Sequence, residues 1–171
     1  YYWATTVFYT LNVALPAGID DQWLEAFTEG LAQDQEYFGI TLIGGDTVGT
    51  PGPMVLSLTA FGEVPASGIV LRAAASPGDI VYVSGTIGDG ALGLRIVTGD
   101  LKGLSEQGAA YLIARYQKPE PRLGILRQLS KDITLAASDV SDGLIADLGH
   151  IANASGVAMT IHADDVPLSP A

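Results

Sequence analysis

The pattern of apolar and polar positions predicts two long strands early in the chain. Residues 3 to 15 are rich in Thr, Val, Tyr and Phe and end at Pro16, so we expect a long β-strand there. In residues 54 to 64, alternate positions differ in polarity and predict a second strand that can pair with the first. The short apolar run at residues 40 to 43 predicts a short buried strand between them. These patterns predict a sheet.

Helical periodicity separates the first two strands. An apolar stripe predicts a helix from Asp20 or Asp21, either of which can cap it, to about Phe38, and Gly39 can end it in a left-handed cap. This stripe consists of Trp23, Leu24, Phe27 and Leu31. Later in the chain, the patterns predict helices at residues 105–117, 121–131 and 144–155, and strands at residues 80–84, 133–137 and 157–162. The mixture indicates an α/β (mixed α+β) fold.

Composition and charge exclude several classes of function. The chain has 171 residues, 48% hydrophobic content and a formal net charge of −11. Residues 1 to 71 contain eight acidic and no basic residues, a surface that repels nucleic acid and anionic membranes. No apolar run reaches the roughly 18 residues of a membrane span. The absence of cysteine excludes disulfides and thiolate metal sites within this chain and is compatible with a cytoplasmic location.

A Pro/Ser/Gly-rich stretch, Pro65 to Gly68, is the best candidate for a domain boundary. It divides the chain into a domain at residues 1–65, a linker at 66–72 and a second domain at 73–171. The chain starts without Met and stops just after a turn, so we expect it to be a piece of a longer protein in which both domains continue.

A glycine pair follows the predicted strand at residues 40–43. In Gly44-Gly45-Asp46-Thr47, the glycines would allow a close approach of the backbone to a ligand, and Asp46 and Thr47 could supply oxygen atoms to it. The alternative is a tight turn in which these side chains bond their own backbone. The spacing leaves both interpretations open.

The segment Ser138-Asp139-Val140-Ser141-Asp142-Gly143 lies where a predicted strand gives way to a helix. Free N–H groups at a helix start favour phosphate, and two carboxylates beside a phosphate require a cation such as Mg²⁺. The simpler interpretation makes Ser141 or Asp142 an N-cap, which leaves Asp139 unexplained. A third interpretation makes Asp139 a nucleophile that forms an aspartyl-phosphate.

Gly88 to Gly93 match the pattern G-x-G-x-x-G after a predicted strand, which permits a dinucleotide-binding domain. A Rossmann unit requires another strand soon after the helix, however, whereas residues 105–117 and 121–131 both predict helices. Close packing of glycines at a helix start therefore explains the pattern better. A strand directly after residues 88–98 would restore the dinucleotide alternative.

Two Asp-bearing motifs, Gly44–Thr47 and Asp139–Gly143, now stand on either side of the predicted boundary. Together with Arg72 before Pro77-Gly78-Asp79, and with Ser84-Gly85-Thr86-Ile87-Gly88-Asp89, they occur in the order found in the thiamine-monophosphate kinases. The chain resembles this family, whose wider group includes aminoimidazole ribonucleotide synthetase. The resemblance implies a two-domain aminoimidazole ribonucleotide synthetase-like fold, with an N-terminal sheet domain that dimerises and a C-terminal α/β domain.

The resemblance also implies functional residues. Asp46, Asp139 and Asp142 would bind two or more Mg²⁺ ions, and Gly45, Asp46, Arg72 and Ser141 would contact ATP. The implied reaction transfers a phosphoryl group from ATP to thiamine phosphate. Because the acceptor is already anionic, we assign no acid, base or nucleophile within this chain. Other ATP-using members of the wider group, and a non-catalytic interaction fragment, remain as alternatives.

Overall fold

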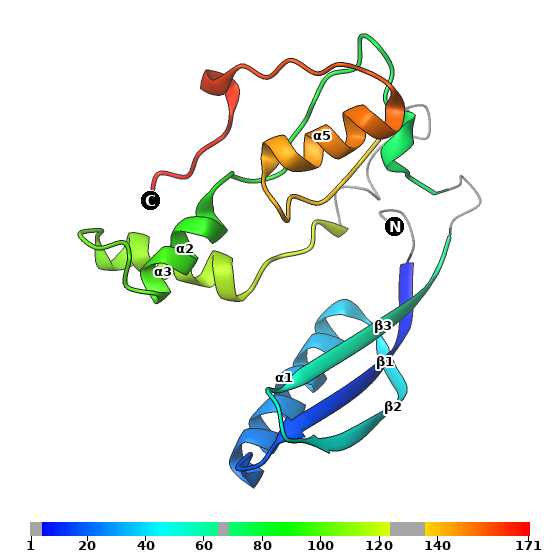
Figure 1. Ribbon diagram of the computed structural model, residues 1–171, viewed down its shortest axis with the longest axis vertical. Helices are drawn as coiled ribbons and strands as arrows, with labels where there is room; N and C mark the ends of the chain where they lie inside the picture. The colour runs from blue at the N-terminus through cyan, green and yellow to red at the C-terminus, as the bar shows by residue number, and fades with distance from the viewer. Residues whose placement is uncertain (1–4, 65–68, 124–135) are drawn as a thin grey trace. The chain divides into compact units, whose positions relative to one another are not determined.

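The computed structural model describes residues 5–64, 69–123 and 136–171 (Figure 1). The chain separates into two compact units, and the first ends at Ile69 while the second begins at Val70. The predicted boundary at residues 65–68 lies outside the described residues. Each unit is described by itself below.

The first unit is a sheet of three strands with one helix against it (Figure 1). Its elements are β1 (Thr5–Pro16), α1 (Asp21–Phe38), β2 (Thr41–Thr50) and β3 (Val55–Glu63). The strand order is β2-β1-β3, with β2 parallel and β3 antiparallel to β1. Because parallel neighbours need a crossover, α1 connects β1 to β2. The predictions of β1, of β3, of their pairing and of α1 are confirmed.

The core of the first unit lies between β1 and α1. Tyr9, Leu11 and Val13 alternate along β1 and are at most 8% exposed, and they pack against Phe27 and Leu31 of the helix. Since successive side chains of a strand point to opposite faces, Phe8, Thr10, Asn12 and Ala14 face away from α1. One face of the sheet is therefore covered by α1 along β1, and the opposite face is open in the described residues.

Strand β2 corrects the prediction for residues 40–47. The predicted strand was short and buried, and it ended before Gly44. In the structure β2 continues to Thr50, and all but the last of its residues are exposed. Gly44 and Gly45 do not favour a strand by themselves, but parallel pairing with β1 supplies the backbone hydrogen bonds that hold them in one. The register of this pairing shifts between Tyr9 and Thr10. The motif Gly44–Thr47 therefore lies in a strand rather than in a turn.

The regular elements in the described part of the second unit are helices. It contains η1 (Arg72–Ala74), α2 (Asp89–Val97), α3 (Glu106–Gln117), α5 (Leu144–Ser155) and η2 (Ala163–Asp165). The helices predicted at residues 105–117 and 144–155 are confirmed, whereas most of the one at 121–131 lies outside the described residues. In the described ranges no helix combines the length and hydropathy needed to cross a bilayer.

Two predicted strands of the second unit are wrong. Residues 80–84 and 157–162 form neither strand nor helix, although their β-branched residues favour extended backbone. A strand needs a neighbour to satisfy its backbone groups, and no described segment pairs with either stretch. Ile80 and Tyr82 are accordingly 73% and 86% exposed. Of the strand predicted at 133–137 only its end is described, and Ala136 makes one isolated parallel bridge to Leu71.

Candidate metal and nucleotide site

The turn before α5 is held by a helix residue and not by a cap side chain. Gly143 occupies the N-cap position with φ 118°, and it provides no side chain to cap the helix. The interpretation of Ser141 or Asp142 as an N-cap is therefore wrong. Instead, the backbone N–H groups of Ser141 and Asp142 donate to Oδ2 of Asp147, at 2.9 and 3.1 Å. This leaves the carboxylate of Asp142 exposed and outside the cap.

Sequence reasoning missed Asp147, which is 3% exposed. The signal was present, because positions 144, 147 and 151 share one face of a helix and this face is otherwise apolar. A charged residue at such a position needs a partner. Potential ligand atoms of Asp142, Asp147 and His150 all lie within 4.8 Å of one another. The structure therefore places Asp147 and His150 beside Asp142, which the sequence analysis gives as a metal ligand.

Arg72 lies in the same unit as the Asp139–Gly143 turn. The bridge between Leu71 and Ala136, with Ala137 N–H donating to Leu71 O at 3.3 Å, places the segment before Arg72 beside the segment that leads into Asp139. Ser155 of α5 also tethers η1, because its Oγ donates to Arg72 O and accepts from Ala75 N–H, at 3.0 and 3.1 Å. The guanidinium of Arg72 is exposed and makes no hydrogen bond or ion pair with any described residue.

Asp46 belongs to a polar row on the open face of the first unit. The register places Asn12 of β1 opposite both Asp46 of β2 and Ser57 of β3, and these residues line a hollow of about 250 Å³. Asp46 Oδ1 accepts a hydrogen bond from Thr47 N–H at 2.8 Å, which is the self-bonding that the turn interpretation anticipated. The other carboxylate oxygen makes no hydrogen bond or ion pair within the described ranges and is available to a ligand.

Gly45 has a structural reason to be glycine. A Cβ added to it would lie 1.8 Å from the carbonyl oxygen of Leu11, and its φ is 150°. The close approach that the glycine pair predicts is therefore made by β1, the neighbouring strand. This contact accounts for Gly45 without a ligand, so a contact between Gly45 and ATP stays a prediction.

The dinucleotide alternative for Gly88–Gly93 is wrong. Helix α2 is followed by α3 and not by a strand. A Cβ on Gly93 would lie 2.1 Å from Leu112 O, at the contact between α2 and α3. Close helix packing therefore explains Gly93, the last glycine of the pattern, whereas Gly88 is the N-cap of α2 with φ 93°.

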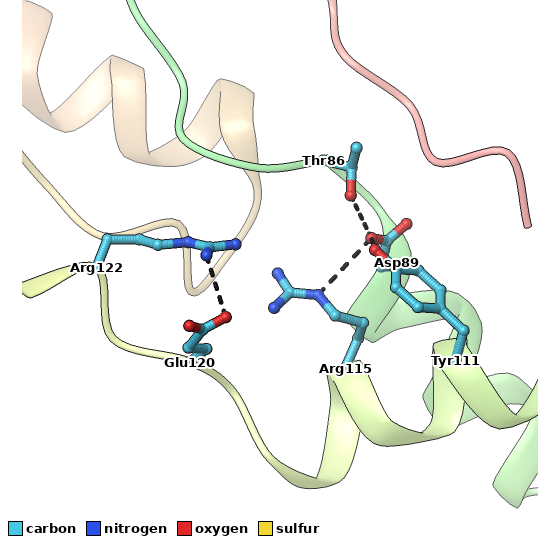
Figure 2. Close-up of polar contacts among 6 residues, drawn as sticks. All are labelled: Thr86, Asp89, Tyr111, Arg115, Glu120 and Arg122. Carbon is cyan, nitrogen blue, oxygen red and sulfur yellow. Dashed lines mark hydrogen bonds and ion pairs between the residues drawn. The ribbon is translucent and has the colours of Figure 1, made fainter. Parts of the chain in front are cut away.

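Asp89 is the polar centre of the contact between α2 and α3 (Figure 2). It is 3% exposed, and its Oδ2 accepts hydrogen bonds from Thr86 Oγ1 and from Tyr111 OH, the latter at 3.1 Å, and lies 3.8 Å from Arg115 Nε. Burial raises the pKa of Asp89, but hydrogen bonds from Thr86, Ser169 and Tyr111 and the charge of Arg115 outweigh burial and leave the pKa below its ordinary value. Asp89 thus stabilises this unit.

The lowered pKa of Asp89 predicts a loss of stability in acid. A carboxyl group with a depressed folded-state pKa contributes stability above the unfolded pKa, about 3.9 for Asp, and loses it as the pH falls through the folded value. The difference in unfolding free energy between the wild type and Asp89→Asn should therefore be largest near pH 7 and should shrink below about pH 4. Urea unfolding across pH 2.5–7 measures it, and a difference that does not change with pH would contradict the role of the charge.

Comparison with known proteins matches this chain to two domains of one family. The family model described as AIR synthase related protein, N-terminal domain, matches residues 3–64, and the model for the C-terminal domain of the same family matches residues 76–170. The chain belongs to the AIR synthase related family.

Within this family, the chain is similar to thiamine-monophosphate kinases. It is 47% identical to the enzyme of Caulobacter vibrioides over 162 residues, which cover 95% of this chain and 45% of that protein. The crystal structure of the enzyme from Stenotrophomonas maltophilia K279a matches with a TM-score of 0.85 and 39% identity, over 99% of this chain and 54% of that one. AaThiL complexed with AMPPCP and TMP matches with a TM-score of 0.80 and 26% identity, over 99% of this chain and 53% of that one. The chain thus spans about half the length of these relatives.

Proposed function

We propose that the full-length protein transfers the γ-phosphoryl group of ATP to thiamine phosphate and produces thiamine diphosphate. The similarity to thiamine-monophosphate kinases across 95% of this chain supports this reaction, as does the relative that binds AMPPCP and TMP. The observation that carries the proposal at the level of residues is the Asp139–Gly143 turn, with two exposed carboxylates, in the unit that also contains the exposed Arg72. ATP as the donor favours the cytoplasm as the compartment.

The chemistry needs positioning and charge neutralisation more than proton transfer. The acceptor oxygen already carries negative charge at neutral pH, so no general base is required to activate it. The main barrier is the repulsion between two anionic phosphates, which cations at the site reduce. Accordingly we propose no residue of this chain as an acid, base or nucleophile.

We propose Asp46, Asp139 and Asp142 as ligands of Mg²⁺. Their carboxylate oxygens are the hard donors that Mg²⁺ prefers, and all three residues are exposed, as ligands of a nucleotide-bound cation must be. Bound Mg²⁺ would neutralise the phosphate oxygens of donor and acceptor. The hydroxyl of Ser141, in the same turn, and the backbone at Gly45 are proposed to contact ATP.

A phosphotransfer assay on the full-length protein tests the reaction. With ATP, Mg²⁺ and thiamine phosphate, we expect thiamine diphosphate and ADP in equal amounts, and we expect EDTA to stop the reaction. Unphosphorylated thiamine should not serve as the acceptor. Formation of ADP only with a different acceptor would favour another ATP-using activity of the family, and no nucleotide binding at all would favour an interaction module.

Arg72→Ala is expected to raise the KM for ATP more than the KM for thiamine phosphate. The guanidinium of Arg72, which has no partner among the described residues, is suited to a phosphate that the cations do not fully neutralise. Its loss should cost about 1.5–3 kcal/mol, as for a hydrogen bond to a charged group. Arg72→Lys should recover only part of this, because a point charge lacks the bidentate geometry. Steady-state kinetics with each substrate varied in turn measures the effect, and unchanged ATP dependence would make Arg72 a surface residue.

We also propose that a second subunit covers the open face of the sheet. Phe8 and Phe61 lie opposite each other in the register and are 43% and 49% exposed, while Val48 and Val55, which flank Ala14, are 52% and 54% exposed. Exposed apolar side chains on adjacent strands usually mark an interface. The full-length protein should therefore sediment as a dimer at micromolar concentration. Phe61→Glu should shift it to the monomer, whereas Tyr37→Ser on α1 should not.

A further inference from the structure

We propose that Asp147 is the positioning residue of the candidate site, and that it fixes the turn that presents Asp139, Ser141 and Asp142. It acts through the backbone rather than as a ligand. This inference rests on the proposed function for its consequence, but its geometry is a property of the described residues alone.

Asp147 is unusual in the direction of its hydrogen bonds. At most helix starts, a residue before the helix accepts hydrogen bonds from N–H groups inside it. Here Gly143 has no side chain to do so, and a residue inside α5 reaches back to two N–H groups that precede the helix, those of Ser141 and Asp142. Asp147 N–H in turn donates to Gly143 O at 3.0 Å. One carboxylate therefore ties the turn to the helix from inside the first turn of α5.

Burial distinguishes Asp147 from the proposed ligands. Asp147 is 3% exposed, whereas Asp139, Asp142 and His150 are exposed. A ligand of a cation that arrives with ATP must be accessible from the site, and Oδ2 of Asp147 already accepts both backbone bonds. A buried charged acceptor with two donors is well suited to hold a backbone in one conformation. The side chains of the turn are positioned as a consequence, because the backbone conformation determines where each side chain begins.

A competing interpretation makes Asp142, Asp147 and His150 a metal site of three ligands, since their ligand atoms lie within 4.8 Å of one another. The two interpretations predict opposite results for conservative variants. Asn at position 147 keeps an oxygen that can accept both N–H groups but removes the charge that a metal ligand needs. Changing His150 matters only if its ring coordinates the ion.

The test combines hydrogen exchange with metal titration on the full-length protein. Mass spectrometry should show faster amide exchange at Ser141 and Asp142 in Asp147→Ala than in the wild type, and near wild-type exchange in Asp147→Asn. Calorimetric titration of Mg²⁺ in the presence of AMPPCP should show an affinity about 10–100-fold lower for Asp147→Ala, the usual effect of removing a residue that orients a ligand. The Mg²⁺ affinity of Asp147→Asn should stay within about threefold of the wild type, because its amide oxygen still accepts both N–H groups, although more weakly than a carboxylate. The Mg²⁺ affinity of His150→Gln should be unchanged.

Specific results would overturn the proposal. If Asp147→Asn and His150→Gln both lose Mg²⁺ as strongly as Asp142→Asn, Asp147 is a ligand. If amide exchange at Ser141 and Asp142 and the Mg²⁺ affinity of Asp147→Ala both match the wild type, Asp147 does not position the turn. Should Asp147→Ala fail to fold, Asp147→Asn alone still separates the two interpretations. Failure of the kinase assay would leave the exchange result standing, so the two proposals fail independently.

Discussion

Asp142→Asn and Asp139→Asn are each expected to reduce thiamine diphosphate formation by the full-length protein by about 10²–10³-fold, the range for removing one preorganised electrostatic contact from an active site. Both carboxylates are exposed, and neither caps α5. Each replacement removes a proposed Mg²⁺ ligand. The exposed side chain of Asp142 contributes no packing, so the melting temperature of Asp142→Asn should stay unchanged. The loss should be partly reversed by raising the Mg²⁺ concentration, because the affected step is the binding of the metal and its nucleotide.

Asp100→Asn is the matched control for this experiment. Asp100 is an exposed carboxylate of the same unit, whose Oδ2 accepts a hydrogen bond from Thr98 Oγ1 at 2.7 Å, and Asn can accept the same bond. Its rate and Mg²⁺ dependence should match the wild type. Wild-type rates in both Asp139→Asn and Asp142→Asn would show that these carboxylates do not hold the metal.

Gly93→Val is expected to destabilise the second unit by about 3 kcal/mol or more, at the upper end of the usual cost of overpacking. The obstacle at Gly93 is backbone, because an added Cβ would lie 2.1 Å from Leu112 O and 2.8 Å from Tyr116 Cβ. Helix α3 would have to move away, and with it Leu112, which is fully buried. The gain in helix propensity from replacing Gly, up to about 1 kcal/mol, cannot offset this displacement.

Gly90→Ala in the same helix provides the contrast. The nearest atom to a Cβ at Gly90 is Arg115 O at 4.0 Å, an ordinary contact. This variant should be neutral or more stable by up to about 1 kcal/mol. Urea unfolding of both variants checks the pair, and equal stability of Gly93→Val and Gly90→Ala would refute the close contact between α2 and α3.

Local patterns were reliable wherever a local cause determines the structure. Strand β1 follows from its β-branched and aromatic residues. Helix α1 follows from its apolar stripe and from two caps, because Asp20 accepts from Trp23 N–H at 2.8 Å and Gly39 adopts φ 65°. The packing of Gly93 was likewise anticipated from its glycine spacing. The strand, the helix and its caps depend on neighbours within a few residues, so the sequence displays them directly. The partner of Gly93, Leu112 on α3, comes only from the structure.

Pairing between distant segments was the main source of error. Gly44 and Gly45 are typical of a turn, yet they lie in β2 because they pair with β1. Residues 80–84 are typical of a strand, yet no described segment pairs with them and they form none. For the candidate site too, the sequence predicted the residues but not their partners. Chain order and residue type were sufficient to select Asp46, Arg72, Asp139 and Asp142 as candidates.

Only tertiary structure decided how these residues are held. It placed the Arg72 segment beside the one that leads into Asp139, set Asp46 opposite Asn12, and assigned the capping of the Asp139–Gly143 turn to Asp147. The physical reason is that burial and backbone pairing are properties of the whole arrangement. The chemistry of a carboxylate can be read from one position, but its partners depend on which distant segments the fold brings to it.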